Sequence, residues 1–385
     1  MFVISYKDLY INCFYYFSRE ETILIRKLSL IGIIILFIGS VFIPVTGKTI
    51  EQSSMKVIGG GILYVGGNGP GNYSSIQDAI NNASYGDTVF VYDDSSPYRE
   101  NVIVNKSIDL IGEDKETTII DGSSKGDVVS IAVDNVTVSE FTIQNSGNGV
   151  NADGIDIRSN QNDLSNNKIL NNKRGILLYH SRNNTISRNN ISLNNWDGIY
   201  IFGGFYNSII DNIIDSNKDK GMILYFTKNN YIADNTISNS EDGIFFTTIC
   251  TNISLLNNTI QSNKYYGMLI SNSHYLSIKG NTITKNKIGI LPVLYSSYLN
   301  ISRNTLTKNV IGVLPYLSSN NTIFQNNFYK NLINAFFKDC ENVWINNYWG
   351  RPRFFPKPIF GLVKSALPYP RINVDIHPAQ KPFEI

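Results

Sequence analysis

The 385-residue sequence has few residues that could form disulfides or bind metals, and almost no excess of charge. It holds 3 cysteines and 3 histidines, and 33 basic residues nearly balance 31 acidic ones. No cluster of methionine or cysteine accompanies His180, His274 or His377, so we expect no metal centre and no cofactor. The net charge is +2 and no basic stripe recurs, which argues against a nucleic-acid partner.

Long apolar stretches with a helical period are also missing from the middle of the chain. In their place, the run N-x-I-x-x-N returns about every 23 residues between Asn167 and Asn331. Each unit contains three short alternating segments bounded by Asn, Ser and Gly, which is the periodicity of strands with turns between them. A fixed period of this size predicts an all-β solenoid, a right-handed single-stranded parallel β-helix. The leucine pattern of leucine-rich repeats and the helices of tetratricopeptide or ankyrin repeats are not seen.

Asparagine and glycine recur at fixed places in these units. If equivalent residues of neighbouring turns lie above one another, the asparagine side chains form ladders of hydrogen-bonded amides that stabilise the corners. The recurring glycine indicates a bend with positive φ or a close approach of two backbones. Cys250 and Cys340 would lie about four turns apart, roughly 19 Å, which is too far for a disulfide.

The ends of the repeat region predict caps and an export segment. Residues 65–112 should hold a capping helix that begins at Ser75 and stops at Gly86, followed by irregular coils; repeats fill 113–347. The tail 348–385, with seven of the twelve prolines, is expected to add no regular strands and to strap the last turn or one wall. Residues 1–47 contain an uncharged apolar stretch at 28–45, either a cleaved signal or a membrane anchor, and 48–64 form a linker. We therefore expect an exported protein.

The chain resembles the pectin-lyase-like parallel β-helix proteins, and among them the NosD-like group. The resemblance lies in the segment from Tyr73 to Ile80, in Gly86-Asp87-Thr88-Val89, in Ile111-Gly112-Glu113, in the repeated coils, and in Asn347-Tyr348-Trp349-Gly350. It covers roughly residues 65 to 385 and implies the fold. The group's name is associated with copper, but the chain lacks a copper-binding pattern, so the resemblance carries no metal over.

Some members of this superfamily cleave uronic-acid polysaccharides with carboxylates on one coil face. Asn151-Ala152-Asp153-Gly154-Ile155-Asp156 is similar to a stretch of polygalacturonase-type hydrolases, but the Asp-Asp pair and Gly-His-Gly expected on the next turns are absent. Asp153, Asp156 and Asp197 are therefore weak catalytic candidates for a lyase or hydrolase. The alternative is that they are ordinary turn residues.

Two further columns of charge have structural and functional interpretations. Arg174, Asp197, Lys220 and Asp242 alternate in sign on consecutive turns, as in a surface charge ladder. Asp211 and Asp234 share one column on adjacent turns, so they are either solvated turn residues or weak candidates for a cation site.

The wall that follows the glycine column is apolar and aromatic over seven turns. We expect outward side chains at Tyr179, Tyr200, Phe202, Tyr225 and Phe245, and an exposed stripe of this length rarely stays bare. The tail or a second copy of the protein could cover it, or a glycan could bind with its sugars on the rings. The leading hypothesis is a surface module, without catalytic activity, that binds glycan or cell-envelope material. A purely structural envelope protein is the further alternative.

Overall fold

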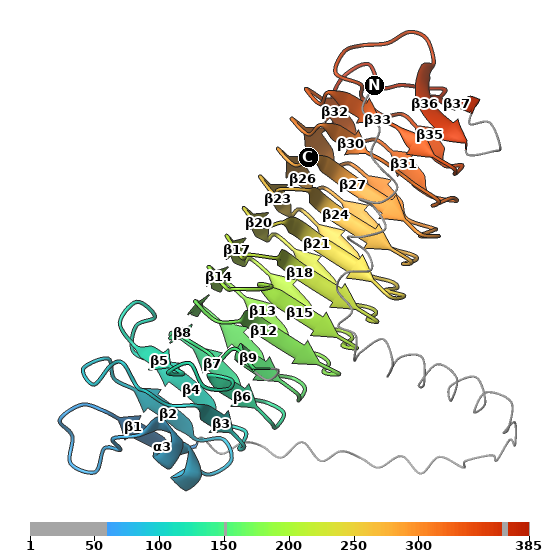
Figure 1. Cartoon of the computed structure of the whole chain (residues 1–385). Helices are drawn as coiled ribbons and strands as arrows, with labels where there is room; N and C mark the ends of the chain where they lie inside the picture. Colours follow the sequence, from blue (N-terminus) through green and yellow to red (C-terminus); the bar gives the residue numbers. More distant parts are fainter. Residues whose placement is uncertain (1–59, 150–151, 364–368, 385) are drawn as a thin grey trace, which may run out of the picture. The chain divides into compact units, whose positions relative to one another are not determined.

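The computed structural model describes residues 60–149, 152–363 and 369–384. Its strands stack into a column of parallel coils that runs from β1 to the last coil (Figure 1). Three parallel sheets, here named A, B and C, form the walls, and a fourth small sheet closes the C-terminal end.

Sheet A has 13 strands. They are β1 (Ile62–Val65), β2 (Thr88–Val91), β4 (Asp109–Gly112), β7 (Thr137–Ser139), β10 (Asp163–Ser165), β13 (Thr185–Ser187), β16 (Ser208–Ile210), β19 (Tyr231–Ala233), β22 (Ser254–Leu256), β25 (Ser277–Lys279), β28 (Asn300–Ser302), β31 (Thr322–Phe324) and β35 (Val343–Ile345).

Sheet B has 10 strands. They are β5 (Ile119–Asp121), β8 (Thr142–Gln144), β11 (Lys168–Leu170), β14 (Asn190–Ser192), β17 (Ile213–Asp215), β20 (Thr236–Ser238), β23 (Thr259–Gln261), β26 (Thr282–Thr284), β29 (Thr305–Thr307) and β32 (Asn327–Tyr329).

Sheet C has 11 strands. They are β3 (Val102–Val104), β6 (Val129–Ile131), β9 (Asp153–Ile157), β12 (Arg174–Tyr179), β15 (Ile199–Phe202), β18 (Lys220–Tyr225), β21 (Asp242–Thr247), β24 (Tyr266–Ser271), β27 (Ile288–Val293), β30 (Ile311–Val313) and β33 (Ile333–Ala335).

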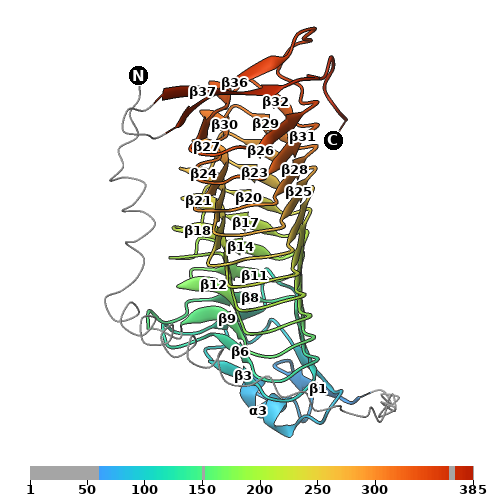
Figure 2. The same ribbon diagram turned by 90° about the vertical axis from the view of Figure 1, so that its right-hand side faces the viewer.

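The register of the coils is the one that the repeat predicts. Ile169 pairs with Ile191, and Ile214 with Ile237, and each of these side chains is fully buried in the core. Most strands of sheets A and B are three residues long with a buried central residue, so one apolar side chain per strand enters the core. Figure 2 shows the coils stacked one above the next along the axis.

The predicted asparagine ladders are confirmed. The side-chain amide of Asn212 donates to Asn235 Oδ1 at 3.0 Å, and the same geometry recurs from Asn235 to Asn258 at 2.9 Å. A third ladder, which was not predicted from the sequence, runs through Asn184 and Asn207 before the strands of sheet A. Its column is harder to recognise because apolar residues replace asparagine for three turns, at Ile253, Leu276 and Leu299.

The recurring glycines are required by close backbone approach. A Cβ on Gly175 would lie 2.5 Å from the carbonyl oxygen of Gly198, and one on Gly198 would lie 2.6 Å from that of Gly221. The corners of the coils that have a positive φ are instead occupied mostly by residues other than glycine, among them Asp211 at φ 55° and Asp234 at φ 57°. Aspartate and asparagine tolerate this conformation better than most residues.

The N-terminal cap contains α3 (Ile76–Asn82), with Ser75 as its N-cap as predicted. The helix ends at Asn82, so the prediction that Gly86 stops it was wrong. Glu100 is an additional cap: its carboxylate accepts from the backbone N–H groups of Ile76 and Gln77, each at 2.9 Å. No described helix has the length and apolar character needed to cross a membrane. The apolar stretch 28–45 lies outside the described residues.

The expectation that the tail adds no regular strands was wrong. After β34 (Phe337–Lys338), the tail forms β36 (Lys357–Val363) and β37 (Tyr369–Asp375), which pair with each other in antiparallel fashion. β36 also pairs with β34, but only over Gly361 and Leu362. The prolines are tolerated because Pro358 lies outside that pairing and Pro370 lies on the edge strand.

The tail also bonds to the last turn. Both oxygens of the buried Asp375 accept backbone N–H groups, from Asn346 and Asn347, and Oδ2 also accepts from the Trp349 indole. Asp375 therefore ends the asparagine ladder with an acceptor that completes its last bonds.

Candidate functional site

The outer face of sheet C is the candidate site because it gathers the charged and aromatic side chains of successive coils. β12, β18 and β21 are six residues long, so they present several outward positions where the strands of sheets A and B present fewer. The pairing of Arg174 with Asp153, and of Leu177 with Asp156, places the predicted carboxylates beside β12.

Three aspartates meet at the N-terminal end of this face. Carboxylate oxygens of Asp127, Asp153 and Asp156 all lie within 4.8 Å of one another. Asp153 is fully buried, and Arg174 donates to both of its oxygens, from Nε at 2.6 Å and from Nη2 at 3.2 Å. Asp127 Oδ1 accepts the backbone N–H of Asp153 at 2.7 Å. The structure thus unites Asp153 with Asp156.

Asp127 was missed from the sequence because it lies 26 residues before Asp153, which is outside the regular period of the repeat. Asp156 differs from Asp153 in having one oxygen without a partner. Arg158 Nε donates to Asp156 Oδ2 at 2.8 Å, whereas Asp156 Oδ1 is buried and makes no hydrogen bond.

Burial dominates the electrostatics of this cluster. It raises the pKa of Asp153 from 3.8 to about 6, although the guanidinium of Arg174 acts in the opposite direction. Burial likewise raises the pKa of Asp156, and Arg158 opposes that shift. The carboxyl groups therefore hold a proton at higher pH than free aspartate does.

The column of alternating charge is buried, and the expectation of a surface ladder was wrong. Asp197, Lys220 and Asp242 are 4%, 7% and 4% exposed. Lys220 Nζ forms an ion pair with Asp219 and lies 3.4 Å from Asp242 Oδ2. Burial raises the pKa of Asp197 to about 7 and that of Asp242 to about 6. Asp197 lies outside the group formed by Asp127, Asp153 and Asp156.

The predicted ligand-binding aromatics form a stacked column of their own. The rings of Tyr179 and Phe202 are 5.2 Å apart and those of Phe202 and Tyr225 are 4.9 Å apart, with interplanar angles of 11° and 6°. The guanidinium of Arg158 lies over the Tyr179 ring at 5.2 Å from its centroid. The faces of these rings are thus largely occupied by one another, and edges are what they present outward.

The remaining side chains of the apolar stripe are covered mainly by contacts with neighbouring side chains. Tyr200 lies edge-on to Phe202 and under the guanidinium of Arg174. Further along, Leu269, Leu291 and Leu314 form a second buried cluster, against which the half-buried Phe245 packs. The open part of the face therefore lies between β9 and β18, where Arg158 and Tyr179 reach the surface.

The weak cation candidates Asp211 and Asp234 are exposed corner residues. Their backbone N–H groups bond to the carbonyl oxygens of Ala233 and Leu256 in the next turn. Among the described residues, neither belongs to a group of three potential ligands.

Comparison with protein-family models identifies the fold. The model of the right-handed β-helix region matches residues 61–237 and 126–274, which together exceed half of the chain. A model described as periplasmic copper-binding protein (NosD) matches residues 216–356. The resemblance seen in the sequence motifs is thereby confirmed.

The residues in the NosD-matched region do not fit a copper centre. Met222, Met268 and Cys250 are fully buried, and Cys340 is 5% exposed. Burial raises the pKa of Cys250 to about 11, which disfavours the thiolate form that binds metal. In the described part of the chain, the one group of three potential ligands is the aspartate cluster, whose hard oxygen donors do not suit copper.

Individual relatives support the same fold. A probable pectinesterase/pectinesterase inhibitor 6 of Arabidopsis thaliana is 31% identical over 119 residues, and this match covers 29% of the chain and 20% of that protein. The A-module of mannuronan C-5 epimerase AlgE6 of Azotobacter vinelandii superimposes with a TM-score of 0.60 at 14% identity, over 71% of this chain and 87% of the module. The Dettilon tailspike protein gives a TM-score of 0.55 at 13% identity, over 80% and 75% of the two chains. The chain belongs to the right-handed parallel β-helix family.

Proposed function

We propose that the chain is an exported β-helix module that binds an acidic polysaccharide on the outer face of sheet C, between β9 and β18, without cleaving it. The observation that carries the proposal is Arg158, whose side chain is 50% exposed at the head of the stacked aromatic column. A guanidinium held on a ring face keeps donors available for a carboxylate, which it can bind with two hydrogen bonds.

The surroundings of Arg158 support a sugar ligand. Tyr179 is 39% exposed, and His180, also exposed, lies edge-on to it with the ring centroids 4.6 Å apart. Rings that are already stacked lose little conformational freedom when a ligand contacts their edges. The names of the relatives point the same way, since one refers to pectin and the other to mannuronan.

The burial of the carboxylates favours binding over catalysis. Asp153 is fully buried with both oxygens held by Arg174, and Asp197 is 4% exposed. A general acid or base must come within hydrogen-bonding distance of the substrate, and burial keeps both of these carboxyl groups from the surface that a polysaccharide would contact. Asp153 and Asp156 act instead as buried counter-ions that hold Arg174 and Arg158 in place.

Export is part of the proposal. The apolar stretch 28–45 follows Arg26-Lys27, a pattern typical of a signal or an anchor, and the matched NosD model is described as periplasmic.

Calorimetric titration with oligogalacturonate and with a neutral glucan tests the proposal. Arg158→Gln should weaken oligogalacturonate binding at least tenfold, since a charge-assisted pair contributes about 1.5–3 kcal/mol. The matched control is Arg303→Gln, which removes the same charge from a corner beyond β28. Equal affinity for the neutral glucan, or unchanged binding by Arg158→Gln, would refute an acidic ligand.

One observation favours a polysaccharide lyase or hydrolase as the second candidate. Asp156 Oδ1 is unpaired, and Asp156 has a raised pKa next to two other carboxylates. A reducing-end and unsaturated-product assay on uronic-acid polymers separates the two functions. Product formation that is lost in Asp156→Asn would establish catalysis and end the binding-only proposal.

A further inference from the structure

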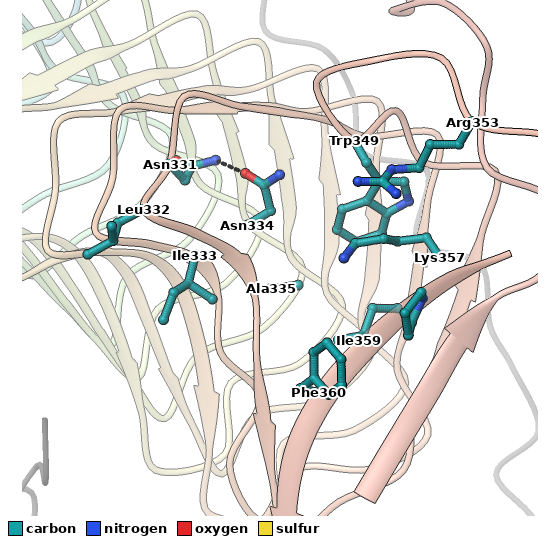
Figure 3. Close-up of a pocket in the computed structure, with 11 residues that line it drawn as sticks. Asn331, Leu332, Ile333, Asn334, Ala335, Trp349, Arg353, Lys357, Ile359 and Phe360 are labelled. Atoms are coloured by element: carbon teal, nitrogen blue, oxygen red, sulfur yellow. Dashed lines mark hydrogen bonds between the residues drawn. The ribbon is translucent and has the colours of Figure 1, made fainter. Parts of the chain in front are cut away.

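The C-terminal hairpin of β36 and β37 has one face that packs on the coil and one that faces outward. On the inner face, Ile359 is buried and Gly361 lies against the Phe337 ring, where a Cβ would approach within 2.5 Å. Figure 3 shows the start of this hairpin beside the last coil, with Arg353 and Lys357 near Trp349. A cavity of about 260 Å³ lies between the two.

The outward face is apolar along its whole length. The pairing of Phe360 with Ile372 and of Leu362 with Pro370 sets these side chains side by side. Phe360, Leu362, Ile372 and Val374 are between 40% and 56% exposed. A two-stranded apolar sheet face left in water is unusual for a soluble protein and marks an interaction surface.

The loop before the hairpin holds two more exposed aromatic side chains. Phe354 is 89% exposed and Phe355 is 81% exposed. They belong to the segment Arg351-Pro352-Arg353-Phe354-Phe355-Pro356, in which two arginines are followed directly by two phenylalanines. Exposed phenylalanine beside arginine is typical of segments that enter the interface of a lipid bilayer.

Basic side chains outnumber acidic ones in the C-terminal segment, although Arg371 is ion-paired with Glu341 of the coil. From Tyr348 onward, the described residues include five basic side chains, Arg351, Arg353, Lys357, Arg371 and Lys381, but only two acids, Asp375 and Glu384. Asp375 is buried in its bonds to the last coil. The basic groups are close enough to interact: burial lowers the pKa of Lys357, and the charges of Arg353 and Arg351 lower it further.

This charge decides between a second copy and a lipid surface. Two copies docked face to face through a twofold axis would bring the same basic rim against itself, and like charges in contact disfavour such a pair. An anionic lipid surface supplies the opposite charge to the rim and an apolar layer to the phenylalanines.

We propose that the outward face of the C-terminal hairpin, with Phe354 and Phe355, docks on an anionic lipid surface. It would hold the C-terminal end of the coil at the membrane while leaving the sheet C face, several turns away, free for its ligand. This proposal is independent of the polysaccharide site.

A fluorescent reporter at the cap tests this docking in the full chain. The apolar stretch 28–45 could itself bind vesicles, so the readout must be local to the hairpin. Phe355→Trp places an indole on the surface, and Tyr295→Trp, at a 72% exposed corner beyond β27, is the matched control. The signal of the native tryptophans is subtracted with the wild type.

With vesicles of phosphatidylcholine and phosphatidylglycerol, Phe355→Trp emission should shift to the blue and be quenched by brominated lipid, while the control stays unchanged. Adding Arg351→Gln and Lys381→Gln should weaken partitioning roughly fivefold for each charge removed, and salt should release the cap. Ile372→Ser, which removes apolar surface without changing charge, should weaken it as well.

Three results would overturn the proposal. The first is an indole that remains in water with anionic vesicles, and the second is equal insertion into vesicles of phosphatidylcholine alone. The third is a blue shift that grows with protein concentration in the absence of lipid, which would assign the face to a second copy.

Discussion

Replacing Asn235 by alanine tests whether the asparagine ladders stabilise the β-helix. Asn235 is 1% exposed, and its Oδ1 accepts from the backbone N–H and the side-chain amide of Asn212, each at 3.0 Å. Its Nδ2 donates to the carbonyl oxygens of Ile209 at 2.8 Å and Ala233 at 2.9 Å, and to Asn258 Oδ1 at 2.9 Å. Alanine removes all five bonds.

The cost follows from which groups lose their partners. The backbone N–H of Asn212 loses its acceptor in a place that water does not reach, and an unpaired buried donor costs about 1–3 kcal/mol. The other groups keep some bonds: Asn212 Nδ2 still donates to the carbonyl oxygens of Ile186 and Ile210. With the small cavity included, we expect Asn235→Ala to lower the free energy of unfolding by about 3–5 kcal/mol.

Urea unfolding followed by circular dichroism measures this change as a shift in midpoint. Asn195→Ala is the control, because Asn195 is an exposed corner residue whose loss should change stability by less than about 0.5 kcal/mol. A loss below about 1 kcal/mol in Asn235→Ala would refute the ladder as a source of stability.

A substitution at Ser240 should stabilise the fold, whereas Asn235→Ala should destabilise it. Ser240 stands where the neighbouring turns have Asn217 and Asn263, and Asn217 Nδ2 donates to the Ile191 carbonyl oxygen but not to Ser240. Ser240→Asn should restore the ladder and stabilise the fold by about 1 kcal/mol in the same assay. If it destabilises, the corner at Ser240 does not accommodate an amide.

Two further predictions concern pH and thiol chemistry. Burial raises the pKa of Asp153 and Asp242 to about 6 and that of Asp197 to about 7 in the folded state, so these groups bind protons more tightly folded than unfolded. Their contribution to stability is therefore present near pH 4 and is lost as the pH rises to about 7. The urea midpoint should fall across this range, and it should fall less steeply in Asp242→Asn. A midpoint that rises with pH would contradict the burial argument. Cys250, with its pKa raised to about 11, and the buried Cys340 should resist a thiol reagent at pH 8 in a Cys13→Ser variant until urea unfolds the chain. Rapid labelling of the folded protein would show that these corners open.

The column of sheet C illustrates where sequence reasoning reached its limit. The alternation of Arg174, Asp197, Lys220 and Asp242 correctly placed these residues one above another, yet it suggested a solvated surface. In the structure, Lys220 and its acidic neighbours are enclosed by adjacent side chains. The repeat in the sequence predicts which residues lie above one another on successive turns. Their exposure to solvent depends on the sizes of the side chains around them, which the repeat does not specify.

The period of the sequence by itself determined the fold, the register and two of the asparagine ladders. Each coil repeats the same local choice of strand, corner and inward isoleucine, so every copy adds to the same signal. Only the tertiary structure decided that Asp127 joins Asp153 and Asp156, that Tyr179 and Phe202 occupy each other's faces, and that the proline-rich tail forms β36 and β37. The repeat places Tyr179 and Phe202 on adjacent turns, but it does not specify how their side chains stack. Asp127 and the tail lie outside the period, so their contacts had no repeated signal in the sequence.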